Sequence, residues 1–301
     1  MLGQFAGEGP ASRVDAFWTN FLQNAGVWSG ERAVIRPSGE VIVILPTQVV
    51  VVEKRGDPKD LDHLEWTTTI QMGTEAESEV SKITRADIEV CGAVDEDGSF
   101  SLGPVVESGE GFKVQTGIVA ENARVLCEFA YGWEGQLQGI IVERGVRVKE
   151  GDETEMEAIV PAAWKSLRVL QDYLVGKWKG DGKLYAARGG RMRLLKTWNW
   201  LDINRQEVFW TSKMEVENAR NSRPVRARGV VDGNLFLFAK DKIQAILAPG
   251  GVCVFVPTFV EQAWAVDTTW LVQPDEKKRV IRSYGPDGWL NTLFLREKRV
   301  G

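Results

Sequence analysis

Short runs of β-branched and aromatic residues, separated by turn sequences, dominate the chain. Residues 41–45 and 49–53 are two such runs, and Pro37-Ser38-Gly39-Glu40 before them is a turn sequence. Asp-Gly pairs at 97–98 and 232–233 lie between further runs, where they supply the positive φ angles that hairpins need. Short strands at regular spacing predict an all-β protein built as a sandwich or barrel.

Two segments depart from this pattern. Apolar residues recur with helical spacing in 14–22 and in 164–174, interrupted in the second only by Gln171. Each segment is followed by a similar phrase, Gly26-Val27-Trp28-Ser29-Gly30 in the first half and Gly176-Lys177-Trp178-Lys179-Gly180 in the second. We expect a short helix at the start of each half, leading directly into a strand that carries a tryptophan.

The two halves also end alike. Tyr131–Val142 aligns with Tyr284–Leu295 without a gap, and Tyr, Gly, Gly and Leu coincide. A repeated opening and a repeated closing predict a tandem duplication. The charged stretch between the halves has no apolar period. We therefore expect domains at 1–148 and 161–301, joined by an acidic linker at 149–160.

Composition excludes several classes of function. The chain has 37 Lys and Arg against 42 Asp and Glu, a net charge of −5, which argues against a dedicated nucleic-acid binder. A single histidine excludes metal sites that need two, so no metal is expected. That residue, His63, lies in a polar segment and is expected at the surface.

Cysteine, membrane and targeting signals are weak. The three cysteines are far apart and form no CxxC pair, which favours buried, reduced thiols. The longest apolar run, 41–52, is too short to span a bilayer, and the N-terminus lacks the features of a secretory signal.

The repeated motif resembles the lipocalin-like, or calycin, barrels. Those barrels begin with a helix and a Gly-x-Trp strand, and they end on a strand that carries arginine. The resemblance implies that Trp28 and Trp178 close one end of each barrel, with a cation stacked on the ring. The candidate cations are Arg144, Arg147, Arg296 and Arg299.

A closer family is similar over most of the chain. Asp97–Pro104 and Asn122–Val125 in the first half, with Leu247–Val252 and Arg279–Tyr284 in the second, resemble DUF3598-type proteins. These are two-barrel proteins of unknown function from cyanobacteria and photosynthetic eukaryotes. The resemblance implies two tandem lipocalin-like antiparallel β-barrels, each preceded by a short α-helix. It also implies a location in the cyanobacterial cytoplasm or the chloroplast stroma.

The same group includes the S-type phycobiliprotein lyases, which hold an open-chain tetrapyrrole, or bilin, in a barrel and deliver it to a cysteine. No lyase motif matches this chain residue by residue, so no catalytic residue is carried over.

Large aromatic residues gather on the predicted strands of the second half. If they point inward, they either fill the barrel or line a flat slot for a conjugated ligand, and a filled barrel is the favoured alternative. The candidates are Trp198, Trp200, Trp210, Phe236, Phe238, Phe255 and Trp270. Arg226 and Arg228 share one face of a strand and could clamp a carboxylate-bearing ligand. A solvated outer face is the favoured alternative for them.

Three functions remain open. The leading hypothesis is binding of a hydrophobic or amphipathic small molecule, such as a tetrapyrrole, in the second barrel, with a photosynthetic acceptor protein as a further partner. The second is a metal-independent chromophore lyase or cyclase/isomerase-type enzyme. The third is an assembly or interaction module without a cavity. A void of about 300 Å³ or more inside a barrel would distinguish the first two from the third.

Overall fold

The fold is known from a computed structural model, which describes residues 13–55, 62–105, 111–149, 167–187, 192–217 and 223–300. The linker expected at 149–160 lies outside these residues from position 150 onward. The described residues are mostly β-strand, as predicted, and short helices precede both halves: α1 (Arg13–Phe21) and α3 (Leu167–Leu174).

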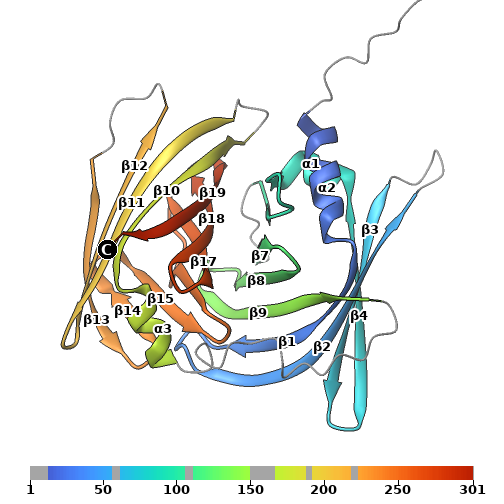
Figure 1. The fold of residues 1–301 in the computed structure, drawn as a ribbon, viewed down its shortest axis with the longest axis horizontal. Helices are drawn as coiled ribbons and strands as arrows, with labels where there is room; N and C mark the ends of the chain where they lie inside the picture. Colours follow the sequence, from blue (N-terminus) through green and yellow to red (C-terminus); the bar gives the residue numbers. More distant parts are fainter. Residues whose placement is uncertain are drawn as a thin grey trace, which may run out of the picture.

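The first half is a single antiparallel sheet in the order β4-β3-β2-β1-β9-β8-β7-β6-β5. Its strands are β1 (Gly26–Ile35), β2 (Val41–Lys54), β3 (His63–Met72), β4 (Glu75–Thr84), β5 (Gly92–Val94), β6 (Phe100–Leu102), β7 (Phe112–Ala120), β8 (Ala123–Tyr131) and β9 (Leu137–Val148). A short 3₁₀ helix, η1 (Leu22–Asn24), connects α1 to β1. The sheet curls around α1 and α2 without closing (Figure 1).

A helix explains why this sheet stays open. The chain passes from β4 to β5 through α2 (Arg85–Cys91), which contacts both edge strands. Thr84 starts this helix with a capping box: its hydroxyl accepts from the Asp87 amide, and the Asp87 carboxylate accepts from the Thr84 amide. The helix therefore occupies the place where β4 and β5 would pair, and the first of the two expected barrels is a half-barrel.

The second half is a closed antiparallel barrel of ten strands, in which β10 pairs with both β11 and β19. The strands are β10 (Gly176–Ala186), β11 (Arg193–Asn204), β12 (Glu207–Val216), β13 (Val225–Asp232), β14 (Leu235–Phe238), β15 (Ile243–Ala248), β16 (Val252–Pro257), β17 (Trp264–Gln273), β18 (Glu276–Gly285) and β19 (Gly288–Val300). A 3₁₀ turn, η4 (Ala239–Asp241), joins β14 to β15.

The two halves share one hydrophobic core. Val125 and Cys127 on the convex face of the half-barrel belong to the same buried cluster as Val254 and Val266 on the outer wall of the barrel. Within this contact the hydroxyls of Thr116 and Thr268 lie 2.6 Å apart and are hydrogen-bonded. Burial of apolar surface from both halves therefore fixes them against each other.

Candidate functional site

A buried tryptophan on β10 contacts both the helix before the barrel and the last two strands. Trp178 is 1% exposed, and its indole N–H donates to the carbonyl of Leu174 at the end of α3, at 3.0 Å. Lys277 Nζ lies 4.5 Å and Arg299 Cζ 5.8 Å from its ring. Arg299 also donates to the carbonyls of Asp172 and Val175, which fastens the helix end to the last strand.

The half-barrel repeats this arrangement. The indole N–H of Trp28 donates to the carbonyl of Asn24 at 2.9 Å, and Arg147 stacks on the ring at 4.4 Å while it donates to the carbonyls of Gln23 and Ala25. Arg124 covers the same ring at 4.5 Å. Burial lowers the pKa of Arg124 to about 10, although Glu143 offsets part of this effect.

Of the four candidate stacking cations, Arg147 and Arg299 stack on the tryptophans, and Arg144 and Arg296 do not. Arg144 and Arg296 each alternate with the stacking arginine three residues later, so they point to the opposite side of the strand. Arg144 pairs with Glu31 at 2.9 Å, and Arg296 pairs with Glu276 at 2.6 Å. Sequence reasoning missed Arg124 and Lys277 because they lie on the neighbouring strand. The strand register shows that the two residues occupy equivalent positions. Arg124 lies opposite Gly145 and Lys277 lies opposite Glu297, and each of these partners is two residues before the stacking arginine of its half.

Charged groups fill the middle of the barrel. Glu297 is fully buried and accepts from Thr197 and Asn199, while Lys277 Nζ and Arg279 Nη1 each lie 3.4 Å from its carboxylate. Arg279 also pairs with Asp267. Two cations and two anions thus form a buried cluster that carries no net charge.

The cluster shifts the pKa values of its members. Burial alone would raise the pKa of Glu297, but Lys277 and Arg279 hold it below its usual value. Burial lowers the pKa of Lys277, and Glu297 opposes that change only in part. Burial would also lower the pKa of Arg279, but Asp267 and Glu297 raise it. All four side chains are buried and paired within the cluster.

Four of the predicted aromatic residues lie inside the barrel. Phe236 and Phe238 are 0% and 1% exposed, and Trp210 lies with its ring centre 5.3 Å from that of Phe255. The cavity beside these rings and Trp178 has a volume of about 20 Å³, room for about one water molecule. The interior at this level is therefore filled by its own side chains.

Two predicted ligand residues lie outside the barrel, which corrects their assignment as cavity lining. Trp200 is 49% exposed, and Trp198 shares its outer face. Lys177 Nζ lies 5.2 Å from the Trp200 ring, and Lys179 and Lys213 lie 6.0 and 5.2 Å from the Trp198 ring. The inward positions of the same strand hold Thr197 and Asn199, which donate hydrogen bonds to the Glu297 carboxylate.

The two candidate arginines face solvent, as the favoured alternative for them predicts, and they form no carboxylate clamp inside the barrel. Arg226 and Arg228 are exposed on the outer face of β13. Arg228 pairs with Glu207 and lies 5.5 Å from the ring of Phe209.

Trp270 is buried, but between the two halves and not inside the barrel, so its assignment as a residue of the barrel cavity is wrong. Its indole N–H donates to the carbonyl of Gly250 at 3.2 Å, and its side chain belongs to the core shared by the two halves. Trp270 therefore lies on the outer wall of the barrel, facing the half-barrel, and not in the lumen.

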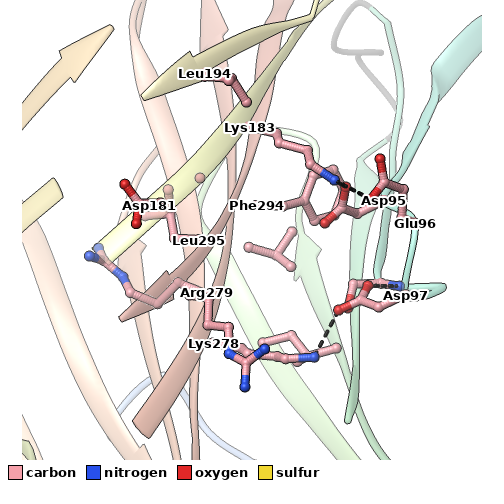
Figure 2. Close-up of a pocket in the computed structure, with 15 residues that line it drawn as sticks. Asp95, Glu96, Asp97, Asp181, Lys183, Leu194, Lys278, Arg279, Phe294 and Leu295 are labelled. Carbon is pink, nitrogen blue, oxygen red and sulfur yellow. Dashed lines mark hydrogen bonds and ion pairs between the residues drawn. The ribbon is translucent and has the colours of Figure 1, made fainter. Parts of the chain in front are cut away.

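Two hollows lie between the halves. The first, about 350 Å³, is lined by Asp95 and Asp97 of the half-barrel and by Lys183 and Lys278 of the barrel (Figure 2). The second, about 420 Å³, lies beside Trp270. Lys278 and Arg296 line both hollows.

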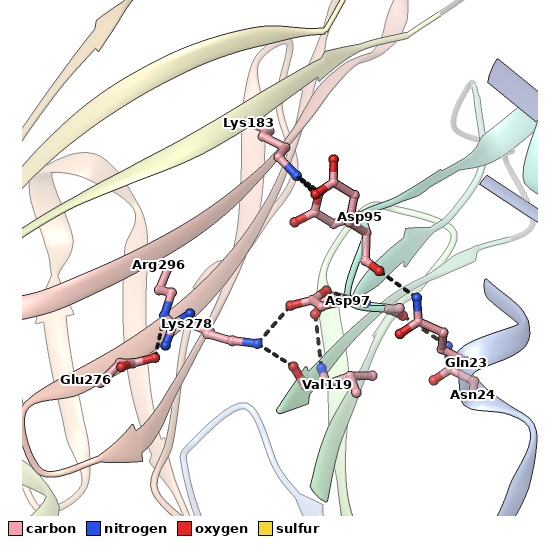
Figure 3. A network of polar contacts seen from close by, with 12 residues as sticks. Gln23, Asn24, Asp95, Asp97, Val119, Lys183, Glu276, Lys278 and Arg296 are labelled. Carbon is pink, nitrogen blue, oxygen red and sulfur yellow. Dashed lines mark hydrogen bonds and ion pairs between the residues drawn. The ribbon is translucent and has the colours of Figure 1, made fainter. Parts of the chain in front are cut away.

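Ion pairs cross the first hollow. Lys183 Nζ lies 3.0 Å from Asp95, and Lys278 Nζ lies 2.8 Å from Asp97 and donates to the carbonyl of Val119 at 2.6 Å (Figure 3). The sequence around Asp95 and Asp97 indicates only a turn. Its two carboxylates in fact join the halves, and a single sequence gives no signal for partners more than eighty residues away.

Metal-ligand clusters and helices able to cross a membrane are both absent from the described residues. No group of three or more His, Cys, Asp or Glu among them could hold a metal ion. His63, expected at the surface, is 8% exposed at the start of β3. None of the helices in the described ranges is long and apolar enough to cross a membrane.

Comparisons with known proteins find a different family model for each half. The family model described as "Domain of unknown function (DUF3598), N-terminal" matches residues 15–148. Residues 15–148 are therefore similar to a DUF3598 N-terminal domain. The DUF3598 resemblance predicted from the sequence is thereby confirmed. Residues 165–300 match a different model, described as "Biogenesis factor required for ATP synthase 1, C-terminal domain". No curated protein matches the sequence.

Solved structures extend the DUF3598 likeness to the whole fold. A DUF3598-family protein of unknown function from Nostoc punctiforme superposes with a TM-score of 0.74 at 21% identity, covering 94% of this chain and 99% of that chain. The S-type phycobiliprotein lyase CPES from Guillardia theta gives a TM-score of 0.36 at 12% identity, covering 49% of this chain and 98% of that chain. The first likeness shows the fold alone, and the second supports no inference about function.

Proposed function

We propose that the protein is an assembly factor that binds a subunit of ATP synthase before the subunit is incorporated into the enzyme. The similarity of residues 165–300 to the C-terminal domain of a biogenesis factor required for ATP synthase supports this proposal. Those residues include the whole described barrel, so the barrel is the part expected to contact the subunit.

The orientation of the barrel's aromatic residues carries the proposal. A carrier of small molecules needs an interior of about 300–1,000 Å³. Here the cavity beside Trp178 and Trp210 measures about 20 Å³, while Trp200 and Phe209 point to solvent. Large side chains available on the outside and packed on the inside favour recognition of a protein over storage of a bilin.

An enzymatic role has less support. A chromophore lyase or isomerase needs an acid or base that faces its substrate. Inside the barrel, Asp267 and Glu297 are both paired with buried cations. The pairing holds the Glu297 carboxylate in its charged form, and both side chains are buried.

Binding to isolated subunits tests the proposal. The protein is mixed with each separately purified subunit of ATP synthase from the same source, and complexes are separated by size-exclusion chromatography. One subunit should form a saturable complex at about 1–10 μM, and deletion of the gene should lower the amount of assembled ATP synthase. Absence of any complex together with an unchanged amount of enzyme would overturn the proposal.

A second candidate is binding of an amphipathic anion between the halves. The two hollows of about 350 and 420 Å³ are large enough for a small molecule, and they share the basic side chains of Lys278 and Arg296. Titration with biliverdin tests this candidate. A saturable absorbance shift that Arg296→Glu removes and Lys240→Glu retains would support it, and a spectrum unchanged at 50-fold excess of biliverdin would exclude a bilin there.

A further inference from the structure

The outward side chains of β10–β13 form an ordered surface around Trp198 and Trp200, called here the tryptophan face. Residues directly opposite one another on neighbouring strands form cross-strand rows. One row is Lys177, Trp200, Thr211 and Arg226, and the next is Lys179, Trp198 and Lys213. Each tryptophan thus has a lysine directly opposite it on at least one side.

A third row extends the same chemistry. Phe209 is 37% exposed and lies opposite Arg228, whose guanidinium is 5.5 Å from the ring. The face therefore combines three large aromatic rings with basic side chains over four consecutive strands. In Figure 1, β11, β12 and β13 lie on the side of the barrel away from the half-barrel, so the halves leave this face uncovered.

The charges on this face are only partly balanced. Lys213 pairs with Glu215, and Arg228 pairs with Glu207. Within the described residues, Lys177, Lys179 and Arg226 have no carboxylate partner, although the chain as a whole carries a net charge of −5. An excess of positive charge therefore lies beside the partly exposed Trp198 and the exposed Trp200.

Among charged macromolecules, an acidic protein fits this surface best. Tryptophan and arginine are enriched among the residues that dominate protein–protein interfaces. A nucleic acid or an anionic membrane needs an uninterrupted basic track, whereas carboxylates of Asp202, Glu207 and Glu215 lie among the cations here. Mixed charges around rigid aromatic rings suit a partner that presents carboxylates next to apolar side chains.

We propose that the tryptophan face is the docking surface for an acidic protein segment, which places its apolar side chains on Trp198 and Trp200 and its carboxylates beside Lys177 and Arg226. This inference rests on the proposed function, because it specifies where and through what chemistry the ATP synthase subunit binds. Trp200, the most exposed of the aromatic rings on the face, is the central contact.

Four variants test the docking surface. Trp200→Ala removes the central ring, and Lys177→Glu reverses a charge that has no carboxylate partner. Trp133→Ala and Lys240→Glu are the matched controls, since Trp133 is 68% exposed and Lys240 is also exposed, and both lie outside the tryptophan face. All four side chains are exposed, so the thermal midpoint should stay near that of the natural protein.

Two probes are measured by biolayer interferometry with immobilised protein. The first is the ATP synthase subunit that binds the natural protein, and the second is a 12-residue peptide of alternating Glu and Leu, with a Lys and Leu peptide as its control. Trp200→Ala and Lys177→Glu should each weaken binding of the subunit and of the acidic peptide at least tenfold. The two control variants should change the affinity for the subunit and for the acidic peptide less than twofold, and the basic peptide should not bind.

The outcomes separate this inference from the proposed function. If the subunit binds and both face variants bind it as tightly as the natural protein, the docking surface is wrong and the function stands. If no subunit binds but the acidic peptide does so through Trp200, the function is wrong and the docking surface stands. Binding of a 30-nucleotide RNA or of phosphatidylserine vesicles through Trp200, without binding of the acidic peptide, would overturn the inference.

Discussion

Removing one charge from the cluster inside the barrel should destabilise the protein strongly. In Glu297→Gln the side chain keeps its size and one carbonyl oxygen that can accept from Thr197 and Asn199, but Lys277 and Arg279 retain only Asp267 as a counter-charge. Breaking a buried ion pair by removing one partner typically costs about 3–5 kcal/mol. We expect the free energy of unfolding to fall by about 3 kcal/mol, since part of the hydrogen bonding survives.

A second substitution distinguishes charge from packing. Glu297→Gln combined with Lys277→Met leaves Arg279 paired with Asp267 and restores a cluster without net charge. The double variant should recover at least half of the loss, and urea unfolding followed by circular dichroism measures both steps as a double-mutant cycle. A loss below about 1 kcal/mol in Glu297→Gln, or no recovery in the double variant, would refute the view that charge balance holds the barrel interior together.

Three further predictions follow from the same contacts. Burial alone would raise the pKa of Glu297, but Lys277 and Arg279 lower it below the value of the unfolded chain. The Glu297 carboxylate therefore stabilises the fold above about pH 4.5, and this stabilisation is lost as the pH falls through the lower native pKa. In urea titrations between pH 5 and pH 3, the free energy of unfolding of Glu297→Gln should therefore fall less steeply with decreasing pH than that of the natural protein, and equal slopes would contradict this. Burial raises the pKa of Cys127 to about 12, so iodoacetamide at pH 8 should alkylate this thiol only after the protein unfolds. Mass spectrometry measures the alkylation, and prompt alkylation of the native protein would contradict the prediction. Arg299→Ala should lower stability by about 1–2 kcal/mol by calorimetry, and Arg296→Ala by less than half as much; equal losses would contradict the stacking on Trp178.

The sequence predicts the class of the fold because its strongest signals are local and repeated. The helix, the Gly-x-Trp strand and the closing arginine strand recur in both halves, and Trp28 and Trp178 make equivalent contacts in the structure. The opening of the half-barrel gives no comparable signal. Strand β4 is exposed over most of its length and has no alternating pattern, and α2 is only seven residues long.

The face of the candidate residues could not be predicted for a specific reason. In β11 the tryptophans alternate with Thr197 and Asn199, and period-two alternation shows which residues share a face but not which face is inside. The usual expectation places aromatic side chains inward. Here the charge cluster requires polar partners inside, so Trp198 and Trp200 point outward. Trp270 illustrates the second limit, because the outer wall of one domain can be buried by another.

Site-specific photo-crosslinking tests the central claim, that the barrel recognises its partner through its outer face. The photoreactive amino acid p-benzoylphenylalanine replaces Trp200, which is 49% exposed, in one variant and the control Trp133, which is 68% exposed, in another. Each is irradiated with the ATP synthase subunit that forms a complex with the natural protein. We predict a crosslinked product from position 200 and none from position 133. A product from position 133 alone, or none from position 200 while the complex is intact, would contradict the claim.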